Sequence, residues 1–249
     1  MTKTALITGG AKRIGKAIAL GLAQRGWNIA LHYSSSQAEA AQVLEQIQAL
    51  NVSTIGLQAD LADSEKVETL IPQAHEALGE VSLLVNNASL FERDTSETLS
   101  VDSWNAHIDV NLRAPALLMR DFAAQSEGGN IINIIDQRVW RLTPDFASYT
   151  VSKTGLWTLT QTFAQALAPK KIRVNGIGPG PTLPNPRQDV AEFEKQARLV
   201  PLGHGASPEE MVTAVDFILN APSMTGQMIA LDGGQHLAWQ TPDVTEVVE

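Results

Sequence analysis

The sequence predicts one doubly wound α/β domain, built on a parallel sheet of about seven strands with helices on both faces. Its 249 residues suit one large domain. Short apolar runs without strict polar alternation, which are typical of strands buried on both faces, recur along the chain. A longer stretch with helical spacing of apolar residues follows most of these runs, and this order favours βαβ units in a parallel sheet.

Runs rich in branched apolar residues and bounded by Gly, Asn or Asp are predicted as the strands: Thr4–Thr8, Asn28–His32, Thr54–Gln58, Leu83–Asn86, Asn130–Ile135, Ile172–Gly176 and Gln227–Leu231. Stretches with apolar residues three and four positions apart are predicted as the helices: Ile14–Gln24, Gln37–Leu50, Ser64–Leu78, Val101–Gln125, Tyr149–Leu167 and Pro208–Asn220. Because no repeat or linker separates these elements, residues 1–249 are predicted to form a single domain.

The stretch Gly178–Ala206 departs from this order, because its prolines exclude a long helix: Pro179, Pro181, Pro184, Pro186 and Pro201. Irregular segments of this length in compact domains are commonly lids or binding loops. Ligands of open α/β sheets bind beyond the carboxyl ends of the strands. We therefore expect residues 181–206 to form a substrate loop.

The composition excludes several classes of protein. With 0 cysteines, the chain has no disulfide scaffold, thiolate metal site or thiol nucleophile. A net charge of −9 argues against a nucleic-acid partner. The five histidines lack metal-ligand spacing, so no metal site is predicted. No apolar run reaches the ~20 residues that a membrane helix needs, and no signal sequence is recognised at the N-terminus. The expectation is a cytoplasmic protein without a membrane partner.

A glycine-rich turn, residues 8–15, follows the first predicted strand and opens the first helix. Its glycines permit a tight turn, and a helix N-terminus presents free N–H groups to an anion. Lys12 and Arg13 oppose the helix dipole by roughly 0.3–1 kcal/mol each, and a bound phosphate would remove that conflict. The turn is therefore predicted to bind a phosphate group.

Two alternatives remain open for this turn. It could be an ordinary solvated connection between strand and helix. It also nearly matches the P-loop of nucleotide triphosphatases, since Gly10 is followed by Gly15 and Lys16. Ala17 departs from that motif, because the last position must offer a hydroxyl group to Mg²⁺.

The segment after the second predicted strand contains Tyr33, Ser34 and Ser35 and no carboxylate before Glu39. Dinucleotide folds usually carry Asp or Glu here to hold the ribose 2′-hydroxyl of NAD. Hydroxyl groups and the nearby Lys12 suit a 2′-phosphate instead, which favours NADP(H). The same serines also fit an ordinary cluster of helix N-cap residues.

Tyr149 and Lys153 stand four residues apart, on one face of a predicted helix. An ammonium group beside a phenol favours the phenolate, so we expect Lys153 to lower the tyrosine pKa from about 10 toward neutrality. The helix follows the strand that ends at Asp136. That strand end and this helix start both face the expected ligand crevice, which predicts proton transfer there.

The motifs in this order resemble those of the short-chain dehydrogenase/reductases: residues 8–15, Asp60-Leu61, Asn86-Asn87-Ala88, Asn111, Tyr149 with Lys153, Pro179-Gly180 and Leu231-Asp232-Gly233-Gly234. The resemblance covers essentially the whole chain. It implies a Rossmann-type domain, a nicotinamide cofactor, and a homotetramer or a dimer.

By this resemblance Tyr149 is the proton donor, Lys153 holds the nicotinamide ribose and lowers the tyrosine pKa, and Asn111 continues a proton relay to solvent through a water. The resemblance and the charge pattern together assign contacts with the cofactor to a larger set of residues: Gly9, Lys12, Arg13, Ile14, Tyr33, Ser34, Ser35, Asp60, Leu61, Asn87, Ala88, Ser89, Tyr149, Lys153, Pro179, Gly180 and Thr182.

Two departures from the family pattern narrow the prediction. Asp136 stands where the family normally has serine, and Arg13 stands where it normally has glycine. Together with Ser89 and Phe91, they resemble the pteridine reductase branch, which includes bacterial dihydromonapterin reductases. That branch implies that Arg13 reaches between pyrophosphate and pterin, that Phe91 stacks on the pterin, and that Ser89 contacts both ligands. Asp136 can exchange hydrogen bonds with ring nitrogens, and with Tyr149 it completes the substrate site.

The sequence therefore predicts an NADPH-dependent reductase that converts a dihydropterin, such as dihydromonapterin, dihydrobiopterin or dihydrofolate, into the tetrahydropterin. One alternative is a short-chain carbonyl or 3-oxoacyl thioester reductase, and another is a protein that binds NADP(H) without catalysis. Simpler roles also stay open for single residues. Phe91 could pack a loop, Asp136 could cap a helix or pair with Arg138 or Arg141, and Arg13 could be solvated.

Overall fold

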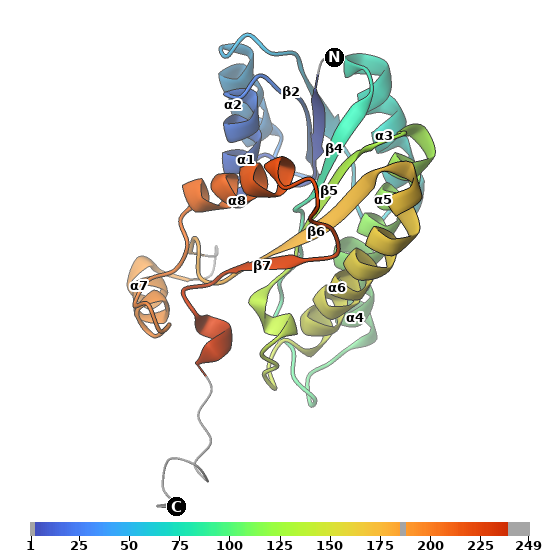
Figure 1. The fold of residues 1–249 in the computed structure, drawn as a ribbon. Helices are drawn as coiled ribbons and strands as arrows, with labels where there is room; N and C mark the ends of the chain where they lie inside the picture. The colour runs from blue at the N-terminus through green and yellow to red at the C-terminus, as the bar shows by residue number, and fades with distance from the viewer. Residues whose placement is uncertain (1–2, 185–187, 239–249) are drawn as a thin grey trace, which may run out of the picture.

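The computed structural model describes residues 3–184 and 188–238. They form a single α/β domain whose 7-stranded parallel sheet has the order β3-β2-β1-β4-β5-β6-β7, with helices on both faces (Figure 1). The strands are β1 (Thr4–Ile7), β2 (Asn28–Tyr33), β3 (Thr54–Gln58), β4 (Val81–Asn86), β5 (Gly129–Ile134), β6 (Ile172–Pro179) and β7 (Met228–Leu231). The predicted fold class and all the predicted strands are confirmed. The largest difference is at β6, which continues through Gly178 and Pro179.

Apolar residues on both sides of each strand explain why helices cover both faces. Successive side chains of a strand point to opposite faces. Leu6 and Ile131 belong to one hydrophobic core, whereas their neighbours Ile7 and Ile132 belong to the other, and all are fully buried. Figure 1 shows one face covered by α1 (Arg13–Ala23), α2 (Gln37–Gln48) and α8 (Pro208–Asn220), and the other by α3 (Ser64–Leu78), α5 (Ala114–Gln125) and α6 (Ala147–Leu167).

The continuous helix predicted over Val101–Gln125 is wrong. The structure divides it into α4 (Val101–Ile108), a π-helical segment (Asp109–Arg113) and α5. Pro115 gives the physical reason, because it has no N–H group to donate to the carbonyl of Asn111 four residues earlier. π-Helical turns inside α-helices occur frequently at functional sites, and this one contains Asn111.

The stretch predicted as irregular contains one short helix, α7 (Val190–Arg198). None of the prolines lies inside it, so the prediction that they exclude a long helix agrees with the structure. A capping box between Asp189 and Glu192 starts the helix. Pro186 and the acidic tail Asp243–Glu249 lie outside the described residues. Within the described part of the chain, no helix combines the length and the apolar composition needed to cross a bilayer.

Candidate active site

A cavity of about 640 Å³ lies at the carboxyl ends of the strands. The strand order turns back at β1 and β4, and open α/β sheets bind ligands at such a switch point. The cavity brings together most of the residues predicted for the site: Gly9, Lys12, Arg13, Ile14, Tyr33, Ser34, Ser35, Asn87, Ala88, Ser89, Phe91, Asp136, Tyr149, Lys153, Pro179, Gly180 and Thr182.

The turn after β1 is tightly packed and leaves the start of α1 open to an anion. Gly9 has a φ of +62°, and a Cβ atom on Gly15 would come within 2.3 Å of the Gly9 carbonyl oxygen. The Asn87 side chain donates to the carbonyls of Thr8, at 2.8 Å, and Gly9, at 3.1 Å. Helix α1 has no side-chain cap and no acid in its first turn. The uncapped backbone N–H groups at the start of α1 therefore fit the pyrophosphate of a dinucleotide.

His32 supports the same turn, a role that the sequence analysis did not assign. Its Nδ1 accepts from the Gly9 N–H at 3.1 Å, so the ring proton is on Nε2, which donates to the Ala59 carbonyl at 3.1 Å. The side chain is 1% exposed. Burial lowers the pKa of His32 to about 4, and the ring is therefore neutral at physiological pH. The sequence signal that could have indicated this role was a polar residue, His32, at the end of a predicted buried strand.

We expect His32 to make the protein sensitive to acid. The folded state binds the imidazole proton less readily than the unfolded chain, whose histidine pKa is near 6.5. The free energy of unfolding is therefore expected to fall by about 3 kcal/mol as the pH drops from 6.5 to about 4. Denaturant unfolding of the wild type and of His32→Gln measures this effect. An unchanged pH slope in the variant would contradict it.

Lys12, which lines the cavity, forms an ion pair with Glu39. The Lys12 Nζ–Glu39 Oε1 distance is 2.6 Å, and both side chains are about half exposed. The hydrogen bond from Lys12 lowers the pKa of Glu39. Ser34 and Ser35 line the same cavity as Lys12. The predicted basic group and hydroxyl groups thus line one cavity. Glu39 would compete with a 2′-phosphate for Lys12.

Arg13 ties the first turn to the loop after β6. Its guanidinium group donates to the carbonyls of Leu183, at 3.0 Å, and Pro184. Its φ of +54° lies in the left-handed region, which explains why related chains favour glycine there. Burial lowers the pKa of Arg13. The predicted position between pyrophosphate and pterin stays a prediction. The residue is exposed, as the simpler alternative expected, but its guanidinium group is held by these two carbonyls.

Asp136 and Tyr149 form a hydrogen-bonded pair in the cavity wall. The Tyr149 hydroxyl donates to Asp136 Oδ2 at 2.8 Å, and the Arg138 N–H donates to Oδ1 at 2.8 Å. Asp136 follows β5 directly and caps the short 3₁₀ turn Gln137–Val139, as one simpler alternative expected. The carboxyl group therefore caps a turn and contacts the phenol at the same time.

The electrostatics of this pair differ from the expectation for Lys153. Burial and the Asp136 charge raise the pKa of Tyr149 well above its ordinary value, rather than lowering it toward neutrality. Burial also raises the pKa of Asp136 and lowers that of Lys153 to about 8. Lys153 Nζ donates to the Ile134 carbonyl at 2.9 Å and lies 5.8 Å from the centre of the Tyr149 ring. The predicted lowering of the tyrosine pKa is wrong.

Asn111 lies outside the cavity lining, with its side chain fully buried. Its amide oxygen accepts from the Leu90 N–H at 2.8 Å, and its amide nitrogen donates to the Leu90 carbonyl at 2.9 Å and to Ser152 Oγ at 3.1 Å. The side chain therefore holds the loop between Ser89 and Phe91. A proton relay through Asn111 stays a prediction that these side-chain contacts do not support.

Phe91 packs against other aromatic rings, as the simpler alternative expected, and its stacking on a pterin stays a prediction. Its ring lies parallel to that of Phe146, with centroids 4.5 Å apart, and meets the Tyr149 ring at a steep angle at 4.7 Å. Phe146 thus covers one face of Phe91, and Arg138 Cζ lies 5.9 Å from the centre of the Phe91 ring. The guanidinium of Arg138 lies over the Phe146 ring at 4.7 Å.

Two predicted cofactor residues do not line the cavity. The Asp60 carboxylate turns back to accept from the Ala62 N–H at 2.9 Å, and Leu61 is buried in a hydrophobic core. Conversely, the cavity wall contains residues that the sequence prediction did not name singly. Gln188, Phe193 and Gln196 lie within the predicted substrate loop, and Gln235 lies near the end of the described chain. The capping box that starts α7 was the sequence signal for the helix that carries Phe193 and Gln196.

The fold and the cavity agree with the family comparison. The model of the short chain dehydrogenase family matches residues 3–195, and the chain belongs to this family. The resemblance drawn from the sequence is therefore confirmed. Related proteins at least 30% identical over nearly the whole chain support the same assignment.

Among its relatives, the chain is similar to the crystal structure of the FolM alternative dihydrofolate reductase 1 from Brucella canis complexed with NADP. The two share 46% sequence identity and a TM-score of 0.93, over 97% of each chain. It is also 31% identical to the 3-oxoacyl-(acyl-carrier-protein) reductase FabG of Staphylococcus aureus, over 95% of this chain and 99% of that protein. A blue fluorescent protein from a metagenomic library, in complex with NADPH, has a TM-score of 0.88, 30% identity and coverages of 94% and 97%.

Proposed function

We propose that this protein is an NADPH-dependent reductase that converts a 7,8-dihydropterin into the tetrahydropterin. The observation that carries the proposal is the hydrogen bond between Tyr149 and Asp136 in the wall of the cavity. Serine, the usual family residue at this position, can polarise a ketone. A carboxyl group can in addition exchange protons with the ring nitrogens of a pterin. The similarity to the dihydrofolate reductase from Brucella supports this substrate class.

The cofactor of this oxidoreductase is NADP(H), and the residues of the cavity fit it. The uncapped start of α1 with Lys12 and Arg13 suits a pyrophosphate and a 2′-phosphate. Tyr149 and Lys153 lie in the same cavity, where the resemblance places the nicotinamide ribose. When bound, NADPH supplies the hydride for an electrophilic C=N carbon of the substrate.

The pKa directions favour Asp136 as the group that gives the proton to the ring nitrogen. Efficient general acids have a pKa near the working pH. Burial moves the pKa of Asp136 upward from 3.8, toward neutrality, whereas it moves that of Tyr149 farther above 10. Tyr149 would hold Asp136 in position and keep its own proton. This assignment shifts the donor role from Tyr149, where the resemblance puts it, to the carboxyl beside it.

A second candidate function is the reduction of a ketone or a 3-oxoacyl thioester. The similarity to the 3-oxoacyl reductase from Staphylococcus aureus favours it, as do the family residues Asn111, Tyr149 and Lys153. In that case Asp136 would replace the usual serine without changing the substrate. A protein that only binds NADP(H) would need no buried carboxyl group against the tyrosine.

Steady-state oxidation of NADPH tests the proposed function. Dihydrobiopterin, dihydromonapterin and dihydrofolate serve as pterin substrates, and a 3-oxoacyl ester and a simple ketone serve as comparisons. We expect turnover with at least one pterin and kcat/KM values for the ketones at least tenfold lower. Turnover of the ketones without turnover of any pterin would contradict the proposal and support the second candidate.

We expect NADPH to be preferred over NADH, and the ion pair between Lys12 and Glu39 supplies matched variants. Lys12→Ala should raise the KM for NADPH about tenfold, the worth of one charge-assisted contact. Glu39→Gln should lower it two- to fivefold, because it releases Lys12 from an exposed ion pair. Neither change should alter the KM for NADH. Equal effects on both cofactors would show that Lys12 does not contact the 2′-phosphate.

We also propose the finer features that the resemblance supplies. Residues 181–206 would act as the substrate loop, supported by the contacts of Arg13 with Leu183 and by the position of Thr182 in the cavity wall. The protein would be cytoplasmic and assemble as a homotetramer or a dimer. Sedimentation of the purified protein distinguishes these assemblies from a monomer.

A further inference from the structure

Asp94 is a buried carboxylate to which the sequence analysis gave no role. It lies in the loop between β4 and α4 and is 2% exposed. Its Oδ1 accepts from the Ser148 N–H at 3.2 Å, and its Oδ2 accepts from the hydroxyls of Ser148 and of Ser103, the latter at 3.2 Å. Burial acts to raise the pKa of Asp94, but the hydrogen bonds from the two serines outweigh it and keep the pKa below its ordinary value.

The contacts of His107 determine which atoms donate and which accept among Asp94, Ser148 and His107. Its Nε2 accepts from the Glu92 N–H at 3.1 Å, so the proton of the neutral ring is on Nδ1. Nδ1 lies 2.8 Å from Ser148 Oγ and 2.9 Å from the Ser103 carbonyl. The Ser148 hydroxyl thus accepts from His107 and donates to Asp94. As an ionised carboxylate, Asp94 accepts from all three of its donors and has no proton left without an acceptor.

The group holds two chain segments that carry residues of the active site. Glu92, which His107 binds, directly follows Phe91, and Ser148 directly precedes Tyr149. The Asp94 carbonyl also accepts from the Phe146 N–H at 2.7 Å. Phe146 has a φ of +62°, a strained value for a bulky residue, and its ring covers one face of Phe91.

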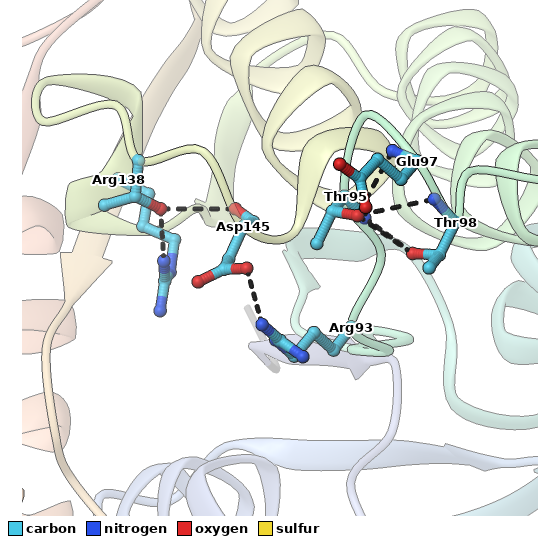
Figure 2. A network of polar contacts seen from close by, with 7 residues as sticks. Arg93, Thr95, Glu97, Thr98, Arg138 and Asp145 are labelled. Carbon is cyan, nitrogen blue, oxygen red and sulfur yellow. Dashed lines mark hydrogen bonds and ion pairs between the residues drawn. The ribbon is translucent and has the colours of Figure 1, made fainter.

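An ion pair on the outer surface links the same two segments. Arg93 and Asp145 lie 2.8 Å apart, with side chains 65% and 42% exposed (Figure 2). Exposed pairs of this kind contribute little to stability. The chain therefore offers an internal comparison, because Asp94 holds the segments from inside and Arg93 links them from outside.

We propose that Asp94, together with Ser148 and His107, is a positioning centre that sets the cavity wall at Phe91, on which Phe146 packs, against the Tyr149 hydroxyl. The inference rests on the proposed function, since that wall is proposed to receive the pterin ring. None of the three residues lines the cavity, so they act through Phe91, Phe146 and Tyr149. We therefore expect the centre to determine how well the substrate is placed and to leave the phosphate-binding turn after β1 unaffected.

Asp94→Asn tests this proposal, because it keeps the shape of the side chain but directs an NH₂ group at hydroxyls that already donate. We expect kcat with dihydrobiopterin to fall about tenfold and the KM for this pterin to rise at least fivefold. The KM for NADPH should change less than twofold. Arg93→Gln, the matched control, should change none of these constants by more than twofold.

A fall in thermal stability with unchanged kcat and unchanged pterin KM would overturn the proposal, because it would indicate a purely structural role. Equal losses in Arg93→Gln and Asp94→Asn would also overturn it. If Asp94→Asn does not fold, Ser148→Ala decides, with the same rise in pterin KM expected and an unchanged value contradicting us. If the wild type reduces only ketones, the proposed function fails, and the same variants measured with a ketone test whether the centre positions Tyr149.

Discussion

Replacement of Asp136 by Asn is expected to lower turnover with a dihydropterin by a factor of about 10³, within the range attributed to general acid catalysis. Asparagine keeps the shape of the side chain and a hydrogen bond with Tyr149, but it has no proton to release. The rate of NADPH oxidation at saturating substrate measures the effect. Binding of NADP(H), followed by fluorescence, should change little and serves as the control for folding.

The pH dependence of the wild type checks the same assignment. If protonated Asp136 is the donor, kcat falls on the alkaline side as that carboxyl loses its proton. If Tyr149 is the donor, kcat persists to pH values above 10, because burial and the Asp136 charge raise its pKa. Asp136→Ser restores the usual family residue and should favour ketones over pterins. A variant that reduces pterins at the wild-type rate would contradict the role of Asp136.

Tyr149→Phe is expected to lower turnover by a factor of about 10² or more. The change removes the hydroxyl that donates to Asp136 Oδ2 at 2.8 Å, and the carboxyl group then loses the partner that orients it. The ring remains, so its contact with Phe91 is preserved. Turnover and the thermal midpoint of unfolding are measured together, since a stable but slow enzyme is the expected result.

Near-normal turnover in Tyr149→Phe would show that Asp136 needs no partner and that the phenol has no part in the reaction. A large loss that addition of a small phenol or another weak acid restores would instead support a proton-transfer role. Tyr149 and Tyr33 are the 2 tyrosines of the chain. Ultraviolet titration of a Tyr33→Phe variant therefore follows Tyr149 alone, and we expect its midpoint well above pH 10.

The fold could be predicted because its signals are local and repeated. Each strand is an apolar run whose side chains contribute to the cores on both faces of the sheet, as Leu6 and Ile7 do. A chain in which strands and helices alternate can adopt only a few sheet topologies. The continuous helix over Val101–Gln125 was predicted wrongly because apolar spacing persists through Pro115. The loss of one backbone hydrogen bond there changes the local winding without changing the pattern of side chains.

The members of the site could be predicted, whereas several of their interactions could not. Residue order places Tyr149, Asp136 and Phe91 in one cavity, as the structure shows. The direction of the Tyr149 pKa depends on burial and on which charge is near, and spacing along a helix gives neither. The contacts of Arg13 with Leu183, and of Asp94 with Ser148, join residues far apart in sequence, and no local motif records them.

The crystal structure of the protein with NADP and a 7,8-dihydropterin tests the central claim most directly. We expect the pterin ring to lie between the Phe91 ring and the nicotinamide. One carboxyl oxygen of Asp136 should lie within hydrogen-bond distance of a ring nitrogen. The Tyr149 hydroxyl should still donate a hydrogen bond to Asp136. A pterin bound elsewhere, or a ring in this cavity without contact to Asp136, would contradict the account.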